Sequence, residues 1–262
     1  MQAFAPPIVD QCCLCGSNKS LSGEHKVEAA ALRSEFGTQR MIIGRPGEPY
    51  RHAQSPKSKQ FHFSARVCEA CNNARTQPAD LAFDAFRTLA SDLMKRGQDP
   101  AQVFDDPRFC ANGGPQYLDV FRYFAKLMCC HLAEMGATFH KPIADFAIGF
   151  SDDNYVLLGV DADVGYRRLQ EEGADYSYAA HGGLIVTGTN HSDAPEAFHS
   201  TLTLGPVRYF YRIHLNEAGQ VNLRNDHPSF YQWCERRIRH ARANPMSDEE
   251  RELLALSGRA ED

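Results

Sequence analysis

Long apolar runs are missing from this sequence of 262 residues. A membrane-spanning helix needs about 20 consecutive apolar residues, and no such run is present. The N-terminal stretch MQAFAPPIVDQ also lacks the basic and then apolar order of a secretion signal. No internal repeat is recognisable, so nothing indicates a repeat architecture. We therefore expect a cytoplasmic protein with no membrane partner.

The composition is that of a globular protein. Apolar residues make up 43% of the chain and charged residues 23%, which is the usual balance for soluble domains. The formal net charge is −5, but it is unevenly spread. Residues 1–100 contain 13 Lys/Arg against 10 Asp/Glu, whereas residues 101–262 contain 15 against 23. The acidic second part argues against a broad DNA-binding surface there.

The nine cysteines divide into two groups. Disulfides are rare in the reducing cytoplasm, so the spacing of the cysteines carries more information than their number. Cys12-x-x-Cys15 and Cys68-x-x-Cys71 have the paired spacing of a tetrahedral zinc site. Cys13 could replace Cys12, although the two-residue gap favours Cys12. We expect one structural zinc ion here, the alternative being two unrelated pairs of buried thiols.

A basic stretch lies between the two cysteine pairs. The segment Arg33–Arg75 holds 8 Lys/Arg against 3 Asp/Glu. Basic residues on an otherwise acidic protein indicate contact with a polyanion such as nucleic-acid phosphates. The alternative is an ordinary solvated loop. A second basic group lies on the predicted helix Phe230–Ala243, where a solvated face is the better interpretation; its members are Arg236, Arg237, Arg239 and Arg242.

The sequence pattern predicts an α+β fold. Helical composition and periodicity mark four segments, namely 27–36, 78–96, 118–135 and 230–243. Strand-like patterns mark four others, namely 61–67, 155–160, 184–189 and 201–215. Residues 12–24 are expected to form a knuckle and a polar connection. Glycines and prolines predict a loop over 37–59.

Three polar residues near the cysteine pairs can build a metal-dependent nuclease centre. Glu24 and His25 follow the first pair, and Asn72 directly follows the second. A carboxylate and an amide oxygen suit a hard cation such as Mg²⁺, which stabilises charge on a scissile phosphate. A neutral imidazole can take a proton from water. Because thiolates suit zinc and oxygens suit magnesium, the two metals can coexist.

With these motifs, the stretch from Cys12 to about Phe86 resembles the HNH endonucleases, also called His-Me finger or ββα-metal nucleases. The resemblance covers roughly a third of the chain. It implies that His25 is the general base and that Glu24 and Asn72 hold catalytic Mg²⁺ or Mn²⁺. It further implies that zinc pins a β-hairpin against a helix and that Arg75 lies near the substrate phosphate.

Two positions depart from the family pattern. Many members have Asp where this chain has Glu24, and the extra methylene moves the carboxylate. The middle Asn of the family is missing from the segment FHFSARV before the second pair. His62 or Ser64 are the residues that can take its bracing role. The 46 residues between His25 and Asn72 are also many, and they accommodate the basic stretch as an inserted DNA-contacting element.

The sequence therefore predicts a metal-dependent endonuclease that cleaves DNA, with RNA not excluded. Residues 1–98 are expected to form a zinc-bound HNH module. Residues 99–262 are expected to form a helical connection and a mainly antiparallel α+β domain. The sequence does not separate binding of a protein partner, sensing of a signal and homodimerisation as the role of this domain. The alternative is a zinc-bearing nucleic-acid-binding or assembly module without cleavage activity. A role as nuclease effector in a bacterial defence or mobile-element system rests on family analogy alone.

Overall fold

The computed structural model describes residues 10–37, 41–43, 51–53, 55, 58–137, 140–171, 179–189 and 191–245. Within these residues the protein combines helices with two two-stranded sheets and one five-stranded sheet, which confirms the predicted α+β class. None of the helices in this part of the chain combines the length and apolarity needed to cross a lipid bilayer.

An antiparallel pair of strands frames the N-terminal region. Strand β1 (Leu21–His25) pairs with β4 (His62–Cys68). The prediction of a strand before the second cysteine pair is confirmed, whereas the polar connection predicted over 12–24 was wrong at its end. β1 was missed because its sequence, LSGEH, has little apolar character of its own and relies on pairing with β4.

Shorter elements lie between β1 and β4 in the sequence. Helix α1 (Ala29–Phe36) falls within the predicted helix. The predicted loop instead contains a small antiparallel sheet of β2 (Met41–Ile43) and β3 (Arg51–Ala53). The apolar triplet MII forms β2 despite the surrounding glycines and prolines. The 3₁₀ turn η1 (Lys59–Phe61) leads into β4. Residues 38–40, 44–50, 54 and 56–57 of the predicted loop, which include Arg40, Arg45 and Lys57, lie outside the described residues.

The second cysteine pair opens a helix. A π-helical turn, η2 (Cys71–Arg75), leads directly into α2 (Gln77–Lys95), as predicted from its periodicity. Pro78 lies in the first turn of α2, where proline is well suited because its missing N–H is not needed. The apolar face of α2 is buried; its members are Ala79, Ala82, Phe83, Phe86, Ala90 and Leu93.

Helix α3 (Tyr117–Glu134) is the centre of the protein. It follows the 3₁₀ turn η3 (Pro100–Asp105) and precedes the short helix α4 (Lys141–Ala147). Every residue from Val120 to Ala133 except Arg122 is buried, which is expected for a helix surrounded by other elements. Gly136 has a φ of 85° just beyond the helix, a left-handed conformation that glycine commonly adopts where helices end.

The C-terminal region is built on an antiparallel five-stranded sheet. Its order is β5-β9-β8-β6, with β7 also paired to β8. The bounds are β5 (Val156–Ala162), β6 (Ala179–His181), β7 (Ile185–Gly188), β8 (Pro195–Leu204) and β9 (Val207–His214). The single strand predicted over 201–215 was wrong, because Gly205, with a φ of 54°, and Pro206 form a hairpin turn between β8 and β9.

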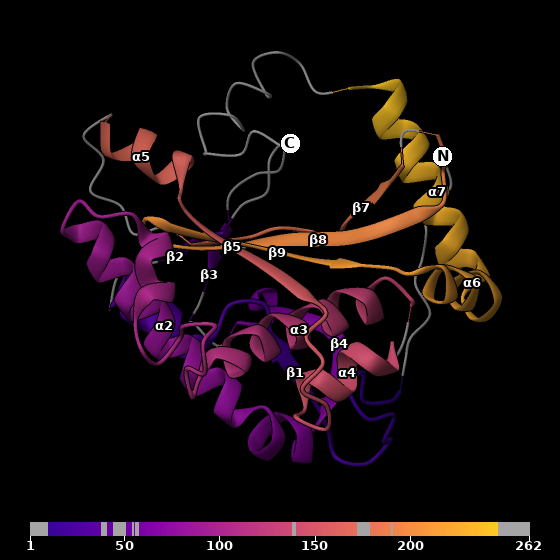
Figure 1. Ribbon diagram of the computed structural model, residues 1–262, viewed down its shortest axis with the longest axis horizontal. Helices are drawn as coiled ribbons and strands as arrows, with labels where there is room; N and C mark the ends of the chain where they lie inside the picture. The colour runs from indigo at the N-terminus through magenta and orange to yellow at the C-terminus, as the bar shows by residue number, and fades with distance from the viewer. Residues whose placement is uncertain are drawn as a thin grey trace.

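One face of this sheet carries the core. In Figure 1 the sheet is seen edge-on, with α2, α3, α4 and the β1/β4 pair on the same side. Tyr209 and Tyr211 of β9 are fully buried there, against Phe83 of α2 and Phe124 of α3. Buried residues from both predicted domains belong to one continuous core. The boundary near residue 98 stays a prediction.

The remaining helices lie toward the ends of the sheet (Figure 1). They are α5 (Val164–Glu171), α6 (Glu217–Asp226) and α7 (Pro228–Ala243). Helix α7 matches the predicted segment and packs on the sheet through Phe230, whose ring stacks on Phe198 of β8 with centroids 5.8 Å apart. Helices α4, α5 and α6 were not predicted.

Candidate metal centre and hydrolytic residues

The two cysteine pairs come together in space. The sulfur atoms of Cys12, Cys15, Cys68 and Cys71 all lie within 4.8 Å of one another. A zinc ion with Zn–S bonds of about 2.3 Å separates tetrahedral sulfurs by about 3.8 Å, which this cluster can accommodate. Among the described residues it is the only cluster of three or more His, Cys, Asp or Glu ligands. The donor set therefore suits zinc or a similar thiophilic metal.

Backbone hydrogen bonds create the cluster. The N–H of Gly16 donates to the carbonyl of Cys12 at 2.9 Å, and Gly16 has a φ of 73° that glycine adopts readily. The N–H of Cys13 donates to the carbonyl of Arg66 on β4 at 2.9 Å. This contact attaches the first cysteine pair to the strand that ends at Cys68. It thereby brings together two cysteine pairs that 52 residues separate in the sequence.

The electrostatics of the cluster favour a cation. A hydrogen bond with the Cys71 side chain lowers the pKa of the Cys12 thiol to about 4, although burial opposes this shift. Burial raises the pKa of Cys15, and interaction with Cys12 raises that of Cys71. A thiolate at Cys12 thus makes it harder to ionise its neighbours. A bound metal would remove this conflict, because all four ligands bind it as thiolates.

Cys13 faces away from the cluster. Its sulfur lies 3.7 Å from the sulfur of Cys130 on α3, and both side chains are buried. Cys12, and not Cys13, therefore belongs to the group of four, as the spacing predicted. Cys129 and Cys234 are also buried, and Cys110 is partly exposed. Four of the five cysteines outside the group are therefore small buried residues of the core.

The predicted acid and histidine lie at an irregularity in β1. Gly23 is paired with Arg66 and His25 with His62, so β4 has two more residues than β1 between these pairs. Such bulges redirect side chains and are common beside functional sites. Glu24 is 4% exposed, whereas His25 is only half-buried. Neighbouring strand residues point to opposite faces, so the two predicted catalytic residues diverge.

His25 lies against His62. Their ring centroids are 3.9 Å apart with an interplanar angle of 40°. A Cβ added to Gly23 would approach Nδ1 of His62 to 3.2 Å, so the glycine leaves room for this ring. Ser64 and Arg66 follow on the exposed face of β4. His62 is therefore the residue beside His25, whereas the backbone N–H of Ser64 donates to Glu134 at 2.9 Å.

Glu24 has a buried cationic partner that the sequence analysis missed. Its Oε1 lies 3.0 Å from Nζ of Lys126, which is 1% exposed and also binds Asp80. Asp80 lies in the first turn of α2. The signal in the sequence was Lys126 itself, a charged residue within the apolar run of α3.

Asn72 is held beside β1. Its Nδ2 donates a hydrogen bond of 3.2 Å to Oγ of Ser22, three residues before His25 on the strand. Ser22 in turn donates to the carbonyl of Val67 at 3.1 Å. This use of the amide nitrogen turns Oδ1 of Asn72 away from Ser22. The turn that follows the zinc ligands is thus attached directly to the strand of His25.

Arg75 contacts the cysteine cluster. Its Nη1 lies 3.4 Å from the sulfur of Cys71, and its guanidinium lies 5.0 Å from the ring centroid of Phe150. Such a donor stabilises a thiolate ligand. The side chain is otherwise exposed, and its expected role at a substrate phosphate stays a prediction. Arg33, Lys59 and Arg66 of the basic stretch are also exposed.

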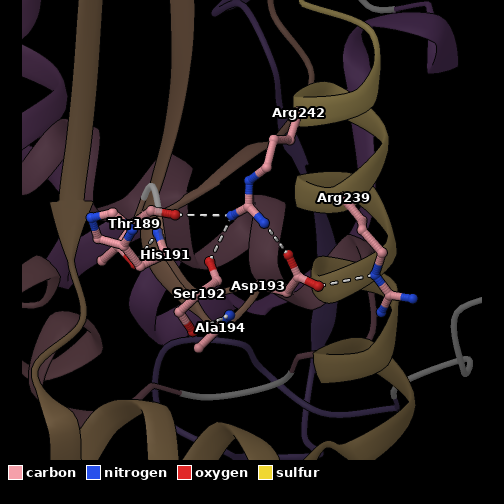
Figure 2. A network of polar contacts seen from close by, with 7 residues as sticks. All are labelled: Thr189, His191, Ser192, Asp193, Ala194, Arg239 and Arg242. Carbon is pink, nitrogen blue, oxygen red and sulfur yellow. Dashed lines mark hydrogen bonds and ion pairs between the residues drawn. The ribbon is translucent and has the colours of Figure 1, made fainter.

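Part of the basic face of α7 binds a loop of the same chain. Figure 2 shows Asp193 accepting hydrogen bonds from Arg239 at 3.0 Å and Arg242 at 2.6 Å. Arg242 also donates to the carbonyls of Thr189 and Ser192 at 2.9 and 3.0 Å. Two of the four arginines therefore fasten the β7–β8 connection to the helix, while Arg236 and Arg237 are exposed.

Comparisons with known proteins found no relative of this chain. No protein-family model matches the chain, and neither curated proteins nor solved structures give a significant match. The resemblance to HNH nucleases thus rests on the motifs in the sequence alone.

Proposed function

We propose that the protein is a metal-dependent endonuclease of the HNH type that hydrolyses phosphodiester bonds in DNA. The observation that carries the proposal is the cysteine cluster at the junction of β1, β4 and the η2–α2 helix. A zinc-pinned antiparallel strand pair followed by a helix is the frame expected of such a nuclease. Asn72 on the helical turn and Ser22 on β1 are in direct contact within that frame.

Each residue of the proposed centre has a role that its chemistry permits. His25, half-buried on β1, acts as the general base that takes a proton from water. His62 packs against it with its ring tilted by 40°. Oδ1 of Asn72 is a ligand for Mg²⁺ or Mn²⁺. When bound, the cation supplies electrostatic stabilisation to the scissile phosphate and the leaving oxygen.

The roles expected for Glu24 and Arg75 have less direct support from the contacts of these residues. Glu24 as a second ligand stays a prediction, since one carboxylate oxygen already faces Lys126. Arg66 shares the exposed face of β4 with His62, so it joins Arg75 as a candidate contact for DNA phosphates.

Asn72→Ala tests the metal role. We expect the Mn²⁺ concentration for half-maximal plasmid cleavage to rise by about tenfold, because one protein ligand is lost. Asn73→Ala is the matched control, since Asn73 is the exposed neighbour on the same turn. Equal metal requirements in the two variants and the wild type would remove Asn72 from the site.

A second function is favoured by one observation. The ammonium of Lys126 lies where a cation at Glu24 would lie, as expected if the module binds nucleic acid without cutting it. In that case DNA binding would fall with rising salt, while no cleavage would appear with Mg²⁺ or Mn²⁺. Metal-dependent cleavage that His25→Ala abolishes would exclude this alternative.

A further inference from the structure

Lys126 is an unusual residue for the middle of α3. It is 1% exposed, and its Nζ lies 3.0 Å from Glu24 and in contact with Asp80. The same Nζ lies 5.2 Å from the ring centroid of Tyr123. A buried ammonium is costly unless it is paired and hydrogen-bonded. Lys126 therefore depends on carboxylates contributed by β1 and α2.

The surrounding charges fix the ammonium in place. Burial alone would lower the pKa of Lys126, but Glu24, Asp80 and Glu28 more than offset this and raise it. Burial raises the pKa of the Glu28 carboxyl to about 8, so Glu28 is mostly neutral at pH 7. Lys126 thus faces the Glu24 and Asp80 carboxyl groups at contact distance. It is the resident cation of this buried group.

This pairing has a consequence for His25. Glu24 occupies the irregularity between the Gly23–Arg66 and His25–His62 pairs. Because Lys126 draws Glu24 toward α3, the next side chain is directed to the other side of β1, where His25 meets His62. The orientation of the histidine is therefore coupled to a helix outside the predicted HNH module.

We propose that Lys126 is a positioning residue of the hydrolytic centre, which holds Glu24 toward α3 and thereby sets the His25 ring against His62. Glu24 then serves Lys126 and not the catalytic cation. The assignment of a hydrolytic centre rests on the proposed function. The coupling from Lys126 through Glu24 to His25 rests on the contacts alone, and the two can be tested separately.

The experiment compares four variants of the full-length protein: Lys126→Met, Lys126→Arg, Glu24→Gln and the double variant Lys126→Met/Glu24→Gln. Lys95→Met is the matched control, because Lys95 pairs with Asp92 on the exposed side of α2. Three quantities are measured: the NMR signals of the His25 ring, the affinity for Mn²⁺ by EPR, and the melting temperature.

The expected results separate positioning from simple stability. Lys126→Met should shift the His25 signals and lower the melting temperature by about 10 °C, because it leaves buried carboxylates unpaired. Lys126→Arg should restore the His25 signals at least in part. The double variant should regain most of the melting temperature but not the His25 signals. Lys95→Met should change neither, and Glu24→Gln should leave the Mn²⁺ affinity within about threefold.

Other results would overturn the proposal. Unchanged His25 signals in Lys126→Met, with a lower melting temperature, would make Lys126 merely structural. A tenfold or greater loss of Mn²⁺ affinity in Glu24→Gln would make Glu24 a metal ligand. If the wild type neither binds Mn²⁺ nor cleaves DNA, the nuclease function fails, while the His25 signals still decide whether Lys126 positions this ring.

Discussion

Replacement of Cys68 by serine removes one of the four clustered sulfur atoms. Cys68 is 4% exposed, and its sulfur lies 3.5 Å from that of Cys15. Structural zinc contributes about 10–16 kcal/mol in zinc-finger peptides, or roughly 2.5–4 kcal/mol for each of four ligands. Since whole domains are stable by only about 5–15 kcal/mol, loss of one ligand is a large perturbation. We expect a drop in melting temperature of about 10 °C.

The assay measures zinc content by mass spectrometry and unfolding by circular dichroism. Cys68→Ser should contain well under one equivalent of zinc, and a chelator should lower the melting temperature of the wild type in the same way. Cys110→Ser is the matched control, because Cys110 is partly exposed and lies outside the cluster. Full zinc occupancy in Cys68→Ser, or equal melting of the two variants, would refute the reasoning.

Two further perturbations address the hairpin and the core. Gly23→Ala should displace His62, because the new Cβ would lie 3.2 Å from Nδ1 of that ring, and DNA cleavage should fall by about tenfold or more. Gly183→Ala is the control, because Gly183 has open space around it, and it should not change the cleavage rate. Equal cleavage rates in the two variants would contradict this prediction. Burial lowers the pKa of His181 to about 3, below the unfolded value near 6.5, so its contribution to stability is complete above pH 6.5 and is lost as pH falls toward 3. From pH 7 to pH 5 the contribution of His181 to the free energy of unfolding falls by about 1–2 kcal/mol. Urea titrations should therefore show a smaller loss of stability between these pH values in His181→Phe than in the wild type. An equal loss in the two proteins would disprove the prediction.

The parts of the site that follow from local sequence were predicted correctly. Two C-x-x-C pairs identify their own ligands, because each spacing is a local geometric requirement. The structure brings Cys12 and Cys71 into one cluster as expected. The periodic helices α2, α3 and α7 were also predictable, since each buries a long apolar face.

The parts that depend on distant residues were not predictable. Strand β1 exists because β4 pairs with it, and no local pattern in LSGEH indicates this. The ion pair of Glu24 with Lys126 joins residues 102 positions apart, so only the presence of a lysine in an apolar helix hinted at it. By contrast, the turn between β8 and β9 had a local signal in Gly205-Pro206, which the long apolar run around it obscured.

The central claim is that His25 activates water in a metal-dependent nuclease. The most direct test is cleavage of supercoiled plasmid with Mg²⁺ or Mn²⁺ by the wild type, His25→Ala and His240→Ala, each with its zinc content measured. The control residue His240 is exposed on α7. The account predicts cleavage by the wild type and His240→Ala, and a loss of about 10²–10⁴-fold in His25→Ala with zinc retained. Equal cleavage by all three proteins, or no metal-dependent cleavage by the wild type, would contradict it.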